Sequence, residues 1–132
     1  MDTRAQGTPQ IWRWLLLELA VGALALAATT LLAPELRMVA RTASLCALLA
    51  GLASLAAVHL GCARGTNGLF AGIGVGFFAR LVLLAVGLVA SHARGDEALV
   101  YAFTFFALFV LTQGTEIAYV LSRSRSHSAR AA

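Results

Sequence analysis

The sequence predicts an all-α integral membrane protein with four transmembrane helices arranged as two antiparallel hairpins. Of its 132 residues, 60% are hydrophobic and only 12% are charged, which is too apolar a composition for a soluble domain of this size. Apolar runs of roughly 20 residues, the length that crosses a bilayer as a helix, occur four times. The connections between these runs are short, so consecutive helices are expected to be antiparallel neighbours.

The expected elements follow in chain order. Residues 1–10 are polar and are expected to be irregular. The first span ends before Pro34, because proline lacks an N–H and its ring clashes with a preceding helical turn. The tight turns "ARGTNG" and "HARGDE" separate the later spans, and residues 122–132 are expected to form a short, basic, disordered tail. A single transmembrane domain over 11–121 therefore has spans at about 11–33, 40–62, 69–91 and 98–121.

The first span could also be a cleaved signal peptide, since "ALA" at residues 25–27 resembles a cleavage site. Its apolar run is longer than the usual signal core and contains Glu18. We therefore expect a retained membrane anchor.

The distribution of arginine predicts the orientation of the chain. Four spans place both termini on one side, and cytoplasmic loops carry the excess of basic residues. The opposite side has fewer arginines, with acidic residues beside them. Both termini are therefore expected to face the cytoplasm. The terminal side holds Arg4, Arg13, Arg64, Arg123, Arg125 and Arg130, and the opposite side holds Arg37, Arg41 and Arg94.

A stripe of glycines and one arginine occupies the third span. Gly72, Gly76 and Arg80 follow at four-residue spacing, and Gly87 lies seven residues further on. Four-residue steps stay on one face of a helix, and glycines there let another helix approach closely. Arg80 is therefore expected to face protein rather than lipid.

Three polar residues on other spans can pair with the guanidinium of Arg80. Gln113 and Glu116 share a face of the fourth span, and Glu18 lies on the first. With Arg80 near the midplane, Glu18 lies roughly 6 Å and Glu116 roughly 10 Å toward the cytoplasm. Charged groups at this depth usually pair inside a bundle and mark function. A structural ion pair, an ion path and a docking site for partner helices all remain open, as does the choice of carboxylate.

Other polar residues have less informative positions. Cys46 and Cys62 are too far apart along one helix to bridge, and His59 and His92 lie near opposite ends of their helices. No metal site, cofactor or nucleic-acid module is expected. The sequence has no nucleophile–base pair or phosphate loop, so an enzyme is not expected. Four hydroxyls can bond back to carbonyls of their own helices, namely those of Thr29, Thr30, Ser44 and Ser54.

The second half of the chain resembles ATP synthase subunit I, a family of small bacterial membrane proteins with four helices. The likeness rests on "GFFARLVLLAVGLVASHARGDEALVYAFTFFALFVLTQGTEIAYVLSRSR". In that family a glycine precedes a basic residue in the third span, as Gly76 precedes Arg80, and a polar residue in the fourth helix corresponds to Gln113 or Glu116. The resemblance implies a non-enzymatic accessory protein of the F-type ATP synthase, which aids assembly or stability of the membrane rotor ring. It also implies a role in magnesium supply, although Mg²⁺ prefers an octahedron of oxygen ligands and carboxylates are scarce here.

Two further hypotheses compete with that expectation. One is a small proton-coupled transporter, as a monomer or a dimer, in which Glu18 is the coupling carboxylate. The other is a structural membrane protein in which the pair formed by Arg80 only fixes helix packing. In all three cases lipid is a partner, and the sequence leaves the oligomeric state open.

Overall fold

The structure, a computed structural model, describes residues 8–132 apart from the side chains of residues 8–10 and 130. This part of the chain is helical, without a strand, and four of its helices are long and apolar enough to cross a membrane. The all-helical prediction with four candidate spans is confirmed. The four helices are α1 (Thr8–Ala28), α2 (Pro34–Cys62), α3 (Thr66–Ala90) and α4 (Asp96–Ala131), and a short 3₁₀ helix, η1 (Thr29–Leu31), follows α1.

Several helix ends differ from the expected boundaries. The expected irregular segment lies mostly outside the described residues, but α1 already begins at Thr8. Helix α2 begins at Pro34 rather than near residue 40. Proline suits the first helical position, where its missing N–H is not needed, and Glu35 complements the positive end of the helix dipole. The same proline therefore ends one helical segment and begins the next.

The expectation of a disordered basic tail differs from the structure, in which α4 continues as one helix to Ala131. Residues 122–131 contain no glycine or proline to end the helix, and arginine and alanine are good helix formers. The 36 residues of α4 correspond to a length of about 54 Å. This length exceeds the hydrocarbon thickness of a bilayer, so the last turns extend beyond the apolar part of the helix.

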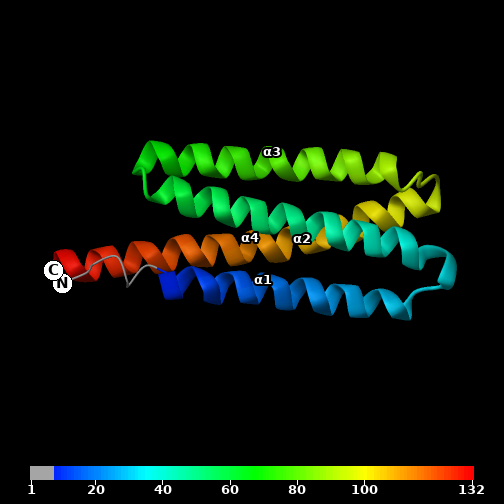
Figure 1. Cartoon of the computed structure of the whole chain (residues 1–132), viewed down its shortest axis with the longest axis horizontal. Coiled ribbons are helices and arrows are strands. Elements are labelled where there is room, and N and C mark those ends of the chain that lie inside the picture. The colour runs from blue at the N-terminus through cyan, green and yellow to red at the C-terminus, as the bar shows by residue number, and fades with distance from the viewer. Residues whose placement is uncertain (1–7) are drawn as a thin grey trace.

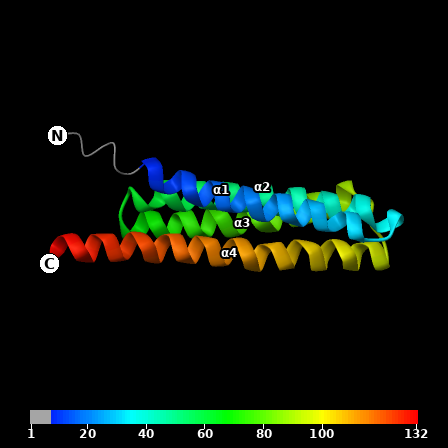
Figure 2. The ribbon, with the colours of Figure 1, turned by 90° about the horizontal axis from the view of Figure 1, so that it is seen from below.

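The four helices lie side by side along one axis (Figure 1). α1, α2 and α3 form one layer, and the view turned by 90° shows α4 running along one side of it (Figure 2). α2 is the central helix and packs against all three others, whereas α3 and α4 make few contacts although a short turn joins them. The turns need backbone that glycine adopts readily, and Gly65 and Gly95 have φ values of 84° and 57°.

The buried face of α2 consists largely of small residues at helical spacing. Ala40, Ala43, Ala47, Ala50 and Ser54 are all buried. Small side chains let helix backbones approach closely in a membrane, which explains why α2 can contact three neighbours. Larger side chains fill the space toward α4, where Tyr101 and Phe105 stack with their ring centroids 6.2 Å apart.

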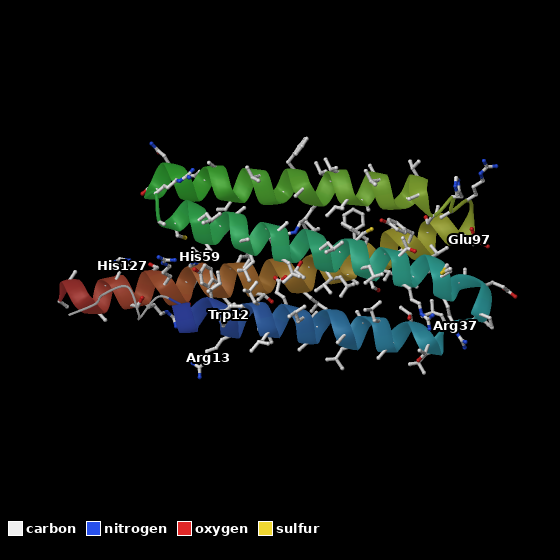
Figure 3. The ribbon with its side chains drawn as sticks, viewed as in Figure 1. Trp12, Arg13, Arg37, His59, Glu97 and His127 are labelled. Carbon is white, nitrogen blue, oxygen red and sulfur yellow. The ribbon has the colours of Figure 1, made fainter. Side chains whose placement is uncertain are left out.

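The start of α1 and the end of α4 lie at the same end of the bundle, and we call this the terminal end (Figure 1). Trp12, Arg13, His59 and His127 lie toward the terminal end, and Arg37 and Glu97 lie toward the opposite end (Figure 3). This charge distribution along the bundle is the one on which the expected orientation depends.

Candidate functional site

The glycine stripe of α3 is its contact surface with the rest of the bundle. The buried residues of α3 are Gly72, Gly76, Arg80 and Gly87, which are the four residues of the expected stripe. A Cβ atom at Gly72 would lie 2.6 Å from the carbonyl oxygen of Ala57 on α2. The close approach therefore occurs within this chain, where α2 covers Gly72 and Gly76, and Tyr101 of α4 contacts Gly87.

Arg80 extends from this stripe into the bundle interior, where it is 4% exposed. Its Nη1 atom donates to the Oε1 atom of Gln113 at 2.8 Å and to the Oε2 atom of Glu116 at 3.1 Å. The guanidinium carbon also lies 5.1 Å from the centre of the Phe109 ring, within the range of a cation–π contact. The contact between Arg80 and Glu116 is the one salt bridge among the described residues. Arg80 therefore pairs with Glu116, whereas the sequence leaves open which carboxylate it chooses.

Ser54, which lies on α2, makes a further hydrogen bond to Glu116. Its hydroxyl donates to the Oε1 atom of Glu116 rather than to a carbonyl of its own helix. The hydroxyls of Thr29, Thr30 and Ser44 do bond back, to carbonyls three or four residues earlier. A carboxylate in an apolar interior is a stronger acceptor than a helix carbonyl that already has a partner, which explains why Ser54 differs.

Glu18 is buried in the same interior without joining this network. It is 1% exposed, and neither carboxyl oxygen has a hydrogen-bond partner. A Cβ atom at Gly51 would lie 2.5 Å from one of its oxygens and 3.0 Å from a methyl carbon of Thr112. Glu18 therefore fits between α2 and α4, in a space that depends on glycine at position 51.

The unsatisfied polar atoms belong to two residues. In the part of the chain that the structure describes, the buried side-chain atoms without a partner are both oxygens of Glu18 and the Nε and Nη2 atoms of Arg80. The interior thus combines a closed ion pair with one further carboxyl group, and we call Glu18, Ser54, Arg80, Gln113 and Glu116 the interior polar cluster.

A pocket beside α4 reaches the interior polar cluster. It has a volume of about 170 Å³ and is lined by Ile73 of α3, Val58 of α2 and one face of α4 that includes Gln113, Glu116 and Ile117. Because α3 and α4 make few contacts, the half-buried Gln113 is reached from this pocket, whereas Glu116 is only 5% exposed. The glycine stripe is closed, but the pocket between α3 and α4 is not.

A second polar cluster lies at the terminal end, and sequence reasoning missed it. Arg123 donates to the hydroxyl of Tyr119 at 2.9 Å, and that hydroxyl lies 2.6 Å from the Nδ1 atom of His59. The Trp14 ring packs edge-on against Tyr119, with centroids 6.1 Å apart. The spacing of Tyr119 and Arg123, one helical turn apart, was a signal for a shared face, but nothing in the sequence linked it to His59.

No group of three or more histidine, cysteine or acidic side chains is placed to hold a metal ion within residues 8–132 as described. Comparison of the chain with protein families, curated proteins and solved structures finds no match. The class of protein that the fold defines is therefore a helical bundle with four candidate membrane spans.

Proposed function

We propose that this chain is a multi-pass protein of the bacterial inner membrane, with both termini in the cytoplasm, that acts without catalysis through helix contacts. Its four helices have the length and apolar composition of membrane spans. Six of the nine arginines other than Arg80 belong by sequence to the side of the two termini, which is the cytoplasmic signature.

Within this class we propose an accessory role in the membrane sector of the F-type ATP synthase, in assembly or stability of the rotor ring. The observation that supports it is the contact between the two elements on which the resemblance to subunit I rests. Arg80, from the third-span element, bonds to Gln113 and Glu116, from the fourth-helix element. We do not extend the proposal to magnesium supply, because an arginine already occupies Glu116 and would repel a cation.

The pocket between α3 and α4 is the place where a partner helix would contact this protein. The glycine stripe is covered by α2 and α4, whereas the pocket exposes apolar side chains around the half-buried Gln113. Interhelical bonds from amide side chains stabilise helix association in membranes. A rotor-ring helix would therefore cover Ile73 and Ile117 and meet Gln113.

Site-specific crosslinking tests the proposed partner. A cysteine at Ile117, in a background with Cys46 and Cys62 replaced by alanine, is expected to crosslink to the rotor-ring subunit in native membranes. A cysteine at Leu24, which is 72% exposed on α1 and far from the pocket, is the control and is expected to give no such product. Equal crosslinking at both positions, or an unchanged yield of assembled rings in a deletion strain, would contradict the accessory role.

Glu18 supports a second candidate function, a proton-coupled transporter. Ionisable groups inside membrane segments mark proton relays, and Glu18 is a buried carboxyl group without a hydrogen-bond donor. The test is proton flux in liposomes in response to a gradient of ethidium, an aromatic cation. Flux that is present in the wild type and absent in Glu18→Gln would establish transport, and equal flux in both proteins would exclude Glu18 as the coupling group.

A further inference from the structure

The terminal end of the bundle contains an open groove between the α2–α3 turn and α4. It has a volume of about 320 Å³. We call the half-buried apolar residues that line it, Cys62, Leu69 and Val120, its floor. We call the polar lining residues Thr66, Arg123 and His127 its rim. The groove thus combines an apolar base with hydroxyl and cationic groups, and none of these residues belongs to the interior polar cluster.

The guanidinium of Arg123 is held in place without being neutralised. Its Nη1 atom donates to the hydroxyl of Tyr119, which is 2% exposed and therefore fixed by packing. The same hydroxyl lies 2.6 Å from the Nδ1 atom of His59, and the Nη1 atom of Arg123 lies 3.5 Å from that nitrogen. No carboxylate lies within salt-bridge distance of Arg123 among the described residues. A fixed and unpaired cation is a ready partner for an anion.

The surroundings of the groove carry further positive potential. Helix α3 begins at Thr66 on the rim, and its preceding residue, Gly65, provides no side-chain cap. The first N–H groups of a helix lack partners within it and carry partial positive charge. Arg64 and Arg125 are exposed at the same end. The described acidic residues outside the interior lie instead in the first turns of α2 and α4, at the opposite end, and are Glu35, Asp96 and Glu97.

We propose that this groove binds the phosphate of an anionic phospholipid headgroup in the leaflet at the terminal end. The inference rests on the membrane insertion proposed above, but not on the partnership with the ATP synthase. Arginine pairs with phosphate through charge-assisted hydrogen bonds, and basic pockets between membrane helices bind anionic headgroups. A lipid fits better than a free phosphate, because its glycerol and acyl carbons cover the apolar floor.

Lipid retention by the purified full-length protein tests the proposal. The protein is reconstituted in phosphatidylcholine nanodiscs with a minor fraction of phosphatidylglycerol, and the lipids that remain bound are counted by native mass spectrometry. The wild type is expected to retain phosphatidylglycerol in preference to phosphatidylcholine. Arg123→Gln is expected to reduce this preference about tenfold, the effect of losing one charge-assisted hydrogen bond.

Arg125→Gln is the matched control, since it removes the same charge two residues away on α4 without lining the groove. It is expected to leave the preference unchanged. Equal losses in the two variants, or no preference in the wild type, would overturn the proposal by reducing it to general attraction of charges. Neither result depends on ATP synthase subunits, so this test and the crosslinking test can fail separately.

Two further measurements address a destabilised Arg123 variant and a soluble phosphate as the occupant. Thr66→Trp adds a large side chain at an exposed rim position and is expected to displace phosphatidylglycerol while every arginine remains. If Arg123→Gln lowers helix content or thermal stability, Thr66→Trp becomes the test of whether the groove holds the lipid. Full retention of phosphatidylglycerol in Thr66→Trp would overturn the proposal. Excess glycerol 3-phosphate is expected not to displace the lipid, and displacement would identify a soluble phosphate as the occupant instead.

Discussion

Arg80 tolerates an apolar interior because its charge meets an opposite charge there. Glu116 supplies the counter-charge, Gln113 shares the same donor atom, and Phe109 offers the negative face of its ring. A charge buried without such partners costs several kcal/mol. The Nε and Nη2 atoms of Arg80 remain without partners, so the network satisfies the charge more fully than the hydrogen-bonding capacity.

The first prediction concerns stability after removal of one partner. Arg80→Leu leaves Glu116 buried without its counter-charge and is expected to lower the free energy of unfolding by about 3 kcal/mol. Replacing both residues with leucine is expected to recover most of this loss, because two apolar side chains leave no buried charge. Unfolding in mixed micelles, followed by circular dichroism, measures both. A double variant as unstable as Arg80→Leu would contradict the pairing.

The same two proteins separate a structural role from a functional one. If the double leucine variant is stable and the rotor ring still assembles at the wild-type yield, the pair only fixes helix packing. If the variant is stable and ring assembly falls, the polar groups themselves contribute to the activity. The proposed accessory role predicts the second result.

At these side chains, the sequence was informative about direction and less so about partners. The four-residue spacing of the glycines placed Arg80 on a protein-facing surface, because helix geometry alone sets which residues share a face. Ser54 and Thr112 could not be placed in the same way, since their roles depend on how α2 and α4 are rotated against each other. Glu18 was one of two candidate partners of Arg80, and it is buried in the same interior beside Gly51 and Thr112 without a hydrogen bond to the guanidinium.

Among the helices, α2 organises the bundle through its small side chains. Ala43, Ala47 and Ala50 allow α1, α3 and α4 to approach the same helix. A Cβ atom at Gly76 would lie 2.9 Å from the Cβ atom of Ser54 and would also overlap its hydroxyl. The distance between α2 and α3 therefore depends on the absence of a side chain at position 76.

The second prediction compares two glycines of α3. Gly76→Ala is expected to lower the free energy of unfolding by about 2 kcal/mol, because overpacking forces the helices apart. Gly74→Ala is the control, since no other atom lies within 4 Å of the position a Cβ would take, and it is expected to leave stability unchanged or slightly raised. Equal effects of the two substitutions in the same unfolding assay would show that α2 does not cover the stripe.

The helix boundaries show where sequence patterns are weakest. Hydropathy located all four helices, because the apolar runs are long, but it placed the start of α2 near residue 40 rather than at Pro34. Charged residues in the first turn of a helix lower hydropathy without ending the helix. The same reason explains α4, whose polar last turns remain helical although their composition is typical of a disordered tail.

For the bundle as a whole, orientation is the property that the charge distribution predicts most directly. By sequence, the side of the two termini carries the arginine excess, and the acids Glu35, Asp96 and Glu97 accompany the arginines of the opposite side. A positive excess retains loops in the cytoplasm. The orientation in turn determines which leaflet would supply a lipid to the groove beside Arg123.

The third prediction is the accessibility of cysteines in intact cells. In a background without Cys46 and Cys62, Asp96→Cys is expected to react with a membrane-impermeant maleimide added outside. Ser126→Cys, which is exposed near the end of α4, is expected to react only after the cells are permeabilised. Each variant serves as the control for the other, and the reverse pattern would mean that the termini face outward.

The most direct test of the central claim is a measurement of the contact between Arg80 and Glu116 in a bilayer. Solid-state NMR of protein labelled with ¹⁵N-arginine and ¹³C-glutamate detects guanidinium nitrogens close to carboxyl carbons. The nitrogen–oxygen distance of 3.1 Å predicts a through-space correlation that is lost in Arg80→Leu and in Glu116→Gln. Absence of that correlation in the wild type, with the Arg80 guanidinium correlated to water instead, would contradict the account.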